Sequence, residues 1–421
     1  MRGRFTADQR RLLNDITALA EFGKVGPTAI TRLAYTQEDN EAHRHVERLM
    51  RDAGMETRYD AFGNLFGRRN GTDAAAKPVV TGSHLDGPPN GGIYDGVIGV
   101  LSGIEVCRML AEAQTRTRRP IEVVAVRCEH LDRFGLSCLG SRAFGGKLKP
   151  GDLDRLKDDA GITLRQALDE CGFEPERLET VNLKDRIHAW VELHVEQGRV
   201  LEDAGKTVGV VTAIAGPTRY KVRIEGIADH SGATPMSIRR DALCGAAEMV
   251  LDLERLSRAT ADCVGTVGIV EAFPGAVHTI PGSAEFYVDI RGVRKEDKQR
   301  LVEDFREAME RRARARDLEL SVETFVDEDP VPCTDWVIET LTGVCRDLDA
   351  NFMIMSSGAG HDTQHVAADA DVGMFFIPSA RGIAHTPDEY TAIEEVAYGA
   401  EVLAESLVRL ADKGDAERGH G

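Results

Sequence analysis

Residues 74–86 read AAAKPVVTGSHLD, and residues 120–130 read PIEVVAVRCEH. Each segment is a short apolar run that ends in polar residues, which is typical of a buried strand followed by a loop. The segment between them, at residues 96–113, reads GVIGVLSGIEVCRMLAEA and is long enough for a helix. Strand, helix and strand in this order predict a β-α-β crossover. We therefore expect an α/β fold with a mixed, largely parallel sheet flanked by helices.

Polar side chains follow both predicted strands. His84 lies just past the first strand, and Glu129 and His130 lie at the end of the second. In sheets of this kind, ligands bind beyond the carboxyl ends of the parallel strands. This position favours a functional role for all three residues.

The pattern of apolar residues changes near residue 214. Segment 214–328 reads as strand, helix, strand, strand, helix and strand, which is the order of a ferredoxin-like α+β sandwich. The chain then returns to the first pattern with a predicted helix at 334–349 and the apolar strand VGMFFIPSA. We therefore expect one domain made of residues 1–213 and 329–421, with residues 214–328 inserted as a second domain.

The composition excludes several classes of function. The formal net charge of −18 would repel a phosphate backbone, so nucleic acid is not an expected partner. No apolar run reaches the length of about 18 residues that a membrane helix needs. The eight cysteines have no regular spacing and read as reduced thiols, which favours a cytoplasmic location.

Histidines and acids gather in glycine-rich loops. His84 is followed by Asp86 and then by Asp95 within the segment TGSHLDGPPNGGIYDG. Imidazole and carboxylate together suit Zn²⁺, Mn²⁺, Co²⁺ or Ni²⁺. A lone histidine is more often structural than a ligand, but the surrounding acids and glycines favour a metal site here.

Six segments occur in an order that resembles the hydantoinase/carbamoylase branch of the M20 metallopeptidase-like family. This branch includes N-carbamoyl-L-amino acid hydrolases and allantoate amidohydrolases. The segments are GSHLDGPPNGGIYDGVIGV (82–100), LGSRAFGG (139–146), ELHVEQGRVLE (192–202), DHSGATPMSIRRDAL (229–243), SSGAGHDTQ (356–364) and GIAHTPDEYT (382–391). The resemblance covers nearly the whole chain.

The resemblance implies a site for one or two divalent metal ions in the main domain. By motif position, His84 and His194 hold one ion, Asp95 bridges, and His385 holds the other. Glu129 matches the family's general base, which takes a proton from a metal-bound water and later hands it to the leaving nitrogen.

This chain departs from the family at residue 130. The family has a second acid after its general base, whereas this chain has His130. Imidazole still binds borderline metals, so we expect His130 to be the remaining ligand. The alternative is that His130 is only a donor behind the ligands and that the enzyme works with one ion.

The inserted domain is expected to act as a lid and as a dimer interface. His230 matches a residue that stabilises the oxyanion, and Arg291 matches a clamp for a substrate carboxylate. Gln197 and Arg239 match residues near the substrate. His278 stands where relatives have asparagine, which is a second departure. Arg291 could instead pair with a neighbouring acid, and Arg239 could simply be solvated.

The sequence therefore predicts an amidohydrolase that cleaves a non-peptide C–N bond of a small carboxylate-bearing substrate, most simply an N-carbamoyl acid. Three alternatives stay open: an N-acyl amino acid deacylase or aminopeptidase, a hydrolytic deaminase of an aromatic or heterocyclic amine, and a catalytically dead binding protein. Retention of Glu129 beside the predicted ligands argues against the last of these.

Overall fold

The structure of the chain is a computed structural model that describes residues 3–414. It divides into two compact units. The first contains residues up to 212 together with 333–355 and the residues from 361 onward, and the second contains Ala213–Pro332 and Ser356–Gly360. Each unit is described by itself.

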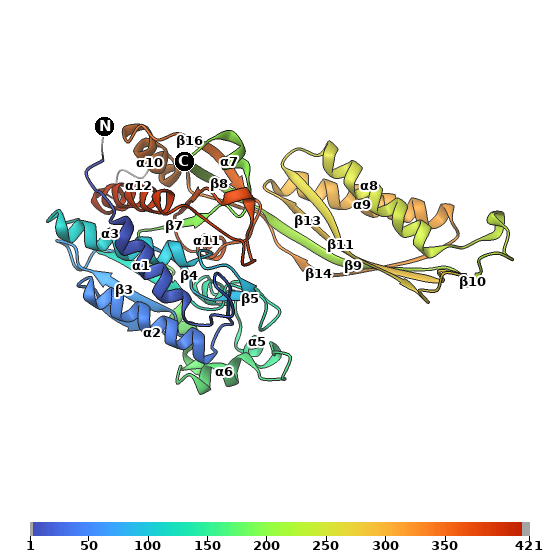
Figure 1. The fold of residues 1–421 in the computed structure, drawn as a ribbon, viewed down its shortest axis with the longest axis horizontal. Coiled ribbons are helices and arrows are strands. Elements are labelled where there is room, and N and C mark those ends of the chain that lie inside the picture. The colour runs from blue at the N-terminus through green and yellow to red at the C-terminus, as the bar shows by residue number, and fades with distance from the viewer. Residues whose placement is uncertain (1–2, 415–421) are drawn as a thin grey trace. The chain divides into compact units, whose positions relative to one another are not determined.

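The first unit is built on a mixed sheet with the strand order β8-β17-β7-β4-β6-β3-β2 (Figure 1). The four strands from β17 to β6 are parallel, and β8, β3 and β2 run antiparallel to their neighbours. The predicted parallel core is confirmed. The strand bounds are β2 (Glu56–Tyr59), β3 (Leu65–Arg69), β4 (Val79–His84), β6 (Ile121–Val126), β7 (Ala189–Val195), β8 (Val208–Ile214) and β17 (Val372–Ile377). Short strands β15 (Val331–Pro332) and β16 (Phe352–Ser357) pair with β8, and β1 (Ile30–Arg32) pairs with β5 (Gly87–Gly91).

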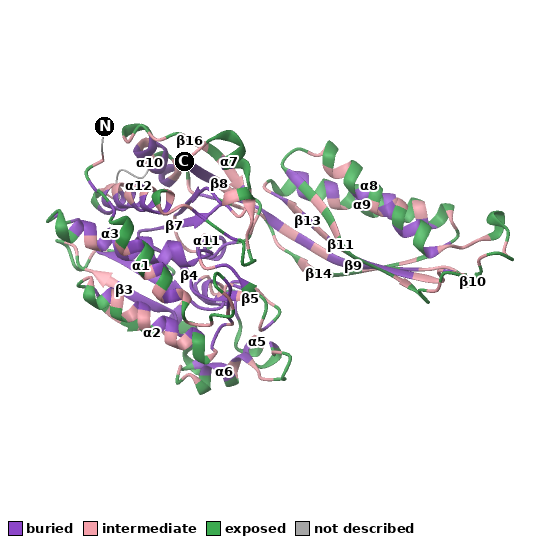
Figure 2. Ribbon diagram, in the orientation of Figure 1, coloured by how far each residue is buried: buried purple, intermediate pink, exposed green. Residues whose placement is uncertain are grey.

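Both faces of the central strands are covered, which explains why their sequences are mostly apolar. In β6, the side chains of Ile121, Val123 and Ala125 join one core, and those of Val124 and Val126 join another. Strands β4, β6 and β7 are buried along their whole length (Figure 2).

Helices supply the two covering layers. One core includes residues of α1 (Gln9–Ala20), α2 (Gln37–Asp52), α3 (Val97–Glu112), α10 (Asp335–Asp347) and α12 (Ile393–Asp412). The other includes residues of α4 (Leu139–Phe144), α5 (Pro150–Arg155), α6 (Leu164–Glu170), η1 (Pro175–Val181) and α11 (Thr363–Val366). The mixed sheet therefore lies between two helical layers, as the sequence predicts.

The second unit is a four-stranded antiparallel sheet with the order β11-β13-β9-β14. Its helices α8 and α9 lie together on one face of this sheet (Figure 1). This is the arrangement expected of a ferredoxin-like sandwich. The bounds are β9 (Gly216–Glu225), β10 (Asp229–His230), α8 (Ala242–Ala259), β11 (Cys263–Phe273), β12 (Thr279–Ile280), β13 (Ser283–Gly292), α9 (Lys295–Ala315) and β14 (Glu319–Asp327).

The remaining expectations from composition concern membranes and thiols. Among residues 3–414, no helix is both long and apolar enough to span a membrane. The eight cysteines are free thiols.

Candidate metal centre and active site

The parallel strands deliver the predicted residues to one edge of the sheet. His84 is the last residue of β4, His194 is the next-to-last residue of β7, and Glu129 and His130 follow β6. His385 lies in the loop after β17. Because β17, β7, β4 and β6 are parallel, their carboxyl ends meet at the same edge.

Asp95 lies among three of these histidines, just before α3. Its Oδ1 is 3.3 Å from Nε2 of His194. Its Oδ2 is 3.1 Å from Nε2 of His130 and 3.2 Å from Nε2 of His385. The amide of Gln197 donates to Oδ1 at 2.7 Å. The two carboxylate oxygens thus divide the histidines into two sets, which is an arrangement that suits a ligand bridging two cations.

Backbone carbonyls fix two of the imidazoles in one tautomer. Nδ1 of His84 lies 3.0 Å from the carbonyl of Asp86, and Nδ1 of His194 lies 2.9 Å from the carbonyl of Val195. A carbonyl only accepts, so each Nδ1 carries the proton and each Nε2 keeps its lone pair. The potential ligand atoms of His84, Asp95 and His130 lie within 4.8 Å of one another. A histidine with its proton on Nδ1 can bind a metal ion through the lone pair on Nε2.

One buried nitrogen shows that the site suits a cation. Nε2 of His194 is buried and makes no hydrogen bond, although Oδ1 of Asp95 is 3.3 Å away. A buried polar atom without a partner is unusual and costly. A divalent ion would give this lone pair a partner, and the surrounding imidazole and carboxylate donors match those of zinc-like ions.

Glu129 stands beside this cluster rather than inside it. Its Oε2 is 3.9 Å from Nε2 of His84 and 3.8 Å from Nε2 of His130. The thiol of Cys138 lies 3.3 Å from its other carboxylate oxygen. The carboxylate of Asp86 accepts from the backbone N–H groups of Glu129 and His130, at 3.1 and 2.9 Å, and thereby fixes the turn after β6.

Burial and charge pairing set the protonation of the cluster. Burial lowers the pKa of His84 to about 4. Burial alone would also lower the pKa of His130, but the hydrogen bond to Asp95 and the negative charges of Glu129, Asp95 and Asp86 together outweigh burial and raise this pKa to about 10. Burial would raise the pKa of Asp95, yet the hydrogen bonds from His130 and His385 hold it well below its usual value.

A second buried group lies next to His194. The potential ligand atoms of Glu192, His194 and His361 lie within 4.8 Å of one another, and the rings of His194 and His361 are 4.6 Å apart. Glu192 accepts from the hydroxyls of Ser83 and Thr363, at 2.8 and 2.6 Å. The sequence prediction did not include Glu192. An acid inside the apolar run AWVELHV was the available signal, because a buried charge requires partners.

Comparison with known proteins gives the family of the chain. The sequence profile of peptidase family M20/M25/M40 matches residues 80–409. This chain belongs to the M20 family.

Curated and solved relatives span nearly the whole M20 chain. An N-carbamoyl-L-amino acid amidohydrolase of Geobacillus stearothermophilus is 40% identical over 402 residues, which cover 95% of this chain and 98% of the relative. A ureidoglycolate hydrolase of Oryza sativa subsp. japonica is 37% identical, over 96% of this chain and 85% of its own length. The crystal structure of an amidase of the hydantoinase/carbamoylase family from Burkholderia multivorans is 34% identical, with a TM-score of 0.92 and coverage of 97% and 99%. The resemblance drawn from the six segments is thereby confirmed.

In the second unit of this M20 chain, His230 has one ring nitrogen committed to the backbone. Nδ1 of His230 accepts from the N–H groups of Gly232 and Ala233, at 3.0 and 3.2 Å. Nε2 therefore carries the proton in the neutral ring, and the ring is exposed. Arg239 donates to the carbonyls of Thr234 and Ser231, so it braces the loop that holds His230.

The other two predicted residues of the second unit lie on β13 and before β12. Arg291 makes a two-pronged ion pair with Asp289, with both distances 3.1 Å, and donates to the carbonyl of Gly358. The pairing with a neighbouring acid that the sequence left open is thus present. His278 is exposed, and its carbonyl accepts from the N–H of Ser231.

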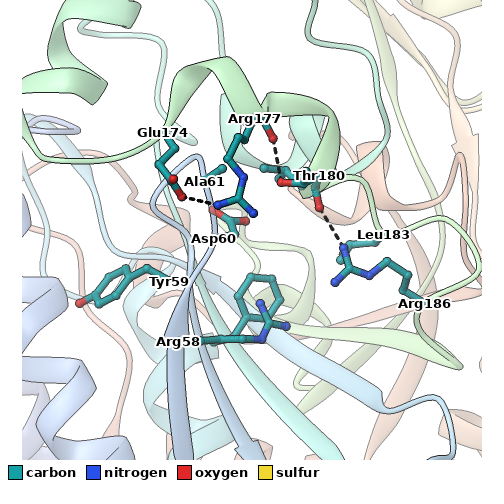
Figure 3. Close-up of a pocket in the computed structure, with 11 residues that line it drawn as sticks. Arg58, Tyr59, Asp60, Ala61, Glu174, Arg177, Thr180, Leu183 and Arg186 are labelled. Atoms are coloured by element: carbon teal, nitrogen blue, oxygen red, sulfur yellow. Dashed lines mark hydrogen bonds and ion pairs between the residues drawn. The ribbon is translucent and has the colours of Figure 1, made fainter.

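A separate cavity of the first unit does not include any of the predicted site residues. It has a volume of about 240 Å³ and is lined by Arg58, Arg177 and Arg186 together with Asp60 and Glu174 (Figure 3). Arg177 pairs with Glu174 at 2.8 Å, and Arg186 donates to the carbonyl of Thr180 at 2.9 Å. These arginines are committed to the protein itself, so the candidate site remains the histidine cluster.

Proposed function

We propose that this chain is a metal-dependent amidohydrolase that cleaves a non-peptide C–N bond of an N-carbamoyl (ureido) acid. The observation that carries the proposal is the position of Asp95 among the Nε2 atoms of His130, His194 and His385, with Glu129 beside them. The names of the relatives, which are hydrolases of carbamoyl amino acids and of ureidoglycolate, support the substrate class.

His84, His194 and Asp95 would hold one divalent ion, and Asp95, His130 and His385 a second. A zinc-like cation in this position supplies Lewis acidity, which polarises a carbonyl oxygen and makes water more acidic. Imidazole at residue 130 favours Zn²⁺, Co²⁺ or Ni²⁺ over Mn²⁺. Mn²⁺ also remains a candidate ion, because a carboxylate contributes to the site as well.

The chain's own residues then handle the proton and the substrate. Glu129 is the general base: it takes a proton from the attacking water and returns it to the leaving nitrogen. The backbone N–H groups of Glu129 and His130 donate to the carboxylate of Asp86, and these bonds keep the Glu129 side chain beside the two histidine rings. Gln197, which already donates to Asp95, is proposed to contact the substrate as well.

Residues of the second unit are proposed to complete the reaction as a lid. Neutral His230 has an N–H at Nε2 to donate to the oxyanion that develops at the carbonyl carbon. Arg239 keeps the His230 loop in shape, and Arg291 is proposed to exchange its pairing with Asp289 for a substrate carboxylate. His278 is proposed as a further polar contact for the substrate.

We also propose a homodimer formed through residues 214–328, and a cytoplasmic location. Strand β11 is an edge strand of its sheet, and Val264, Ile269, Val270 and Phe273 on it are exposed. An exposed apolar edge strand is suited to pairing with a second copy. The free thiols support a reducing compartment.

The test is ammonia release from N-carbamoyl-L-amino acids, β-ureido acids and allantoate after loading with Zn²⁺, Co²⁺, Ni²⁺ or Mn²⁺. Ammonia release from one class of ureido substrate, together with loss of this release when a chelator is added, would support the proposal. Turnover confined to acyl amides or to ring amines would show that His130 and His278 have changed the substrate specificity of the site. The proposed substrate class would then be acyl amides or ring amines instead of ureido acids. Thermal stabilisation by ligands without any turnover would indicate a binding protein.

A further inference from the structure

Glu389 joins two distant segments of the candidate metal centre. Its Oε1 accepts from the backbone N–H groups of Tyr94 and Asp95, both at 2.9 Å. Its Oε2 accepts from the backbone N–H of His385 at 3.2 Å. One carboxylate therefore holds the loop before α3 and the loop after β17, which are nearly 300 residues apart in the sequence.

The His385 loop needs such support. His385 has a φ of +60°, a conformation that non-glycine residues rarely adopt and that persists only when the surroundings impose it. Its side chain is 50% exposed, whereas that of Asp95 is 5% exposed. Packing alone therefore constrains His385 far less than it constrains Asp95.

The Asp95 loop is shaped around the same carboxyl group. A Cβ atom at Gly92 would lie 2.5 Å from the Cβ, Cδ and Oε1 atoms of Glu389, so only glycine leaves room there. Glu389 is itself 4% exposed, and both of its oxygens are occupied by N–H donors. It is thus not placed to bind an ion or to move a proton itself.

We propose that Glu389 is a positioning residue for cation binding: by binding the backbone of Asp95 and of His385, it sets the separation at which both side chains reach one ion. This inference rests on the proposed metal dependence and assigns part of the metal affinity to a residue outside the ligand set. Residues that orient metal ligands typically contribute about 10- to 100-fold to affinity.

The test is the equilibrium binding of Co²⁺ to the full chain, followed by its visible absorption and by competition with a chelator. Glu389→Gln retains the shape and one acceptor oxygen but presents an NH₂ group to one of the backbone donors. We expect the dissociation constant to rise by about 10- to 100-fold and the Co²⁺ spectrum to change. The control is Glu401→Gln, because Glu401 is half-buried and also accepts from a backbone N–H, that of Ala7 at 3.1 Å, without contact to the proposed ligands.

A second arm separates positioning from general destabilisation. In a His385→Ala background, Glu389→Gln should cost less Co²⁺ affinity than it does in the wild-type chain, because part of its effect passes through His385. Wild-type affinity in Glu389→Gln, an equal loss in Glu401→Gln, or full additivity with His385→Ala would overturn the inference while leaving the proposed function standing. If the wild-type chain binds no divalent cation at all, the proposed function and this inference both fail.

Discussion

Nε2 of His130 lies 3.1 Å from Oδ2 of Asp95, the carboxylate oxygen that also faces His385. An imidazole thus occupies the position where the family resemblance leads one to expect a second acid. As the proposed ligand, a neutral imidazole would leave the centre with one negative charge fewer, which would make a bound cation more electrophilic and favour an anionic substrate.

Replacement of His130 by alanine should remove one ligand and lower the metal content of the purified chain, because the remaining donors hold that ion less tightly. His130→Glu should retain the metal, since a carboxylate also binds it. Elemental analysis after dialysis against metal-free buffer measures both. His45→Ala is the control, as His45 lies on α2, away from the site. Full metal content in His130→Ala would remove His130 from the ligand set.

Glu129→Gln should lower kcat by about 10²- to 10⁴-fold, because the amide cannot accept the proton that the reaction must move. The metal content should not change, since Glu129 lies beside the ligand atoms rather than among them. Steady-state kinetics and metal analysis on the same preparation separate the two. Loss of metal together with activity would make Glu129 a ligand instead of a base.

Gly96 has a φ of +67°, and a Cβ atom there would lie 2.4–2.5 Å from the ring of His84. Gly96→Ala should therefore displace this histidine and reduce metal binding. Gly54→Ala is the matched control, because Gly54 has a φ of +79° but no atom within 4 Å of such a Cβ. Both variants should lose about 1 kcal/mol of unfolding free energy from backbone strain, but only Gly96→Ala should lose metal affinity. Equal metal affinity in the two variants would contradict the steric explanation.

His365 gives a pH dependence of stability that is independent of the metal ligands. It is buried in α11, and burial, followed by the charges of Arg142 and Lys147, holds its pKa well below 6.5. The unfolded chain therefore binds this proton more readily, so the free energy of unfolding falls as the pH drops below 6.5.

His365→Gln removes this titration and leaves an acceptor for the Lys147 ammonium, which lies 3.3 Å from Nδ1. Between about pH 6 and pH 5, wild type should lose more unfolding free energy than the variant does, up to the one-proton limit of about 1.4 kcal/mol per pH unit. Urea unfolding at each pH measures the difference. Parallel pH profiles would show that His365 is protonated as easily in the folded chain as in the unfolded one.

The edge strand β11 offers a test of the proposed dimer. Val270 is 48% exposed on this strand, so Val270→Lys should place a charge on the pairing edge and shift the protein toward monomer. Leu251→Lys is the control, because Leu251 is 64% exposed but lies on helix α8. Sedimentation velocity reports the change. A dimer that survives Val270→Lys but not Leu251→Lys would move the interface to the helical face.

The sequence predicted the parts of the fold that have a strong apolar pattern. Strands β4 and β6 are largely apolar and fully buried because both faces are covered, and their parallel pairing predicted that His84, Glu129 and His130 would share an edge. Edge strand β2 reads ETRY and has no buried residue, so its sequence carries no such signal. The short helices α4–α6 were missed for a related reason, since six or seven residues give too few turns for a periodic pattern.

The candidate site divides in a similar way. Side chains that meet through strand ends could be placed from the order of strands alone. Contacts from a side chain to the backbone could not be predicted in this way. Glu389 accepts from three backbone N–H groups, and these contacts depend on the path of two loops. Residues two apart on a strand lie on the same face, so the sequence allowed Arg291 to pair with Asp289. It did not decide between this pairing and the binding of a substrate carboxylate.

The most direct test of the central claim is removal and return of the metal in a single preparation. The protein is treated with a chelator and dialysed, and hydrolysis of an N-carbamoyl-L-amino acid is then followed as Co²⁺ or Zn²⁺ is added back. The account predicts that ammonia release disappears with the metal and returns with it in wild type, and that Glu129→Gln binds the returned metal but stays inactive. Full ureido hydrolysis by the metal-free chain would contradict the account.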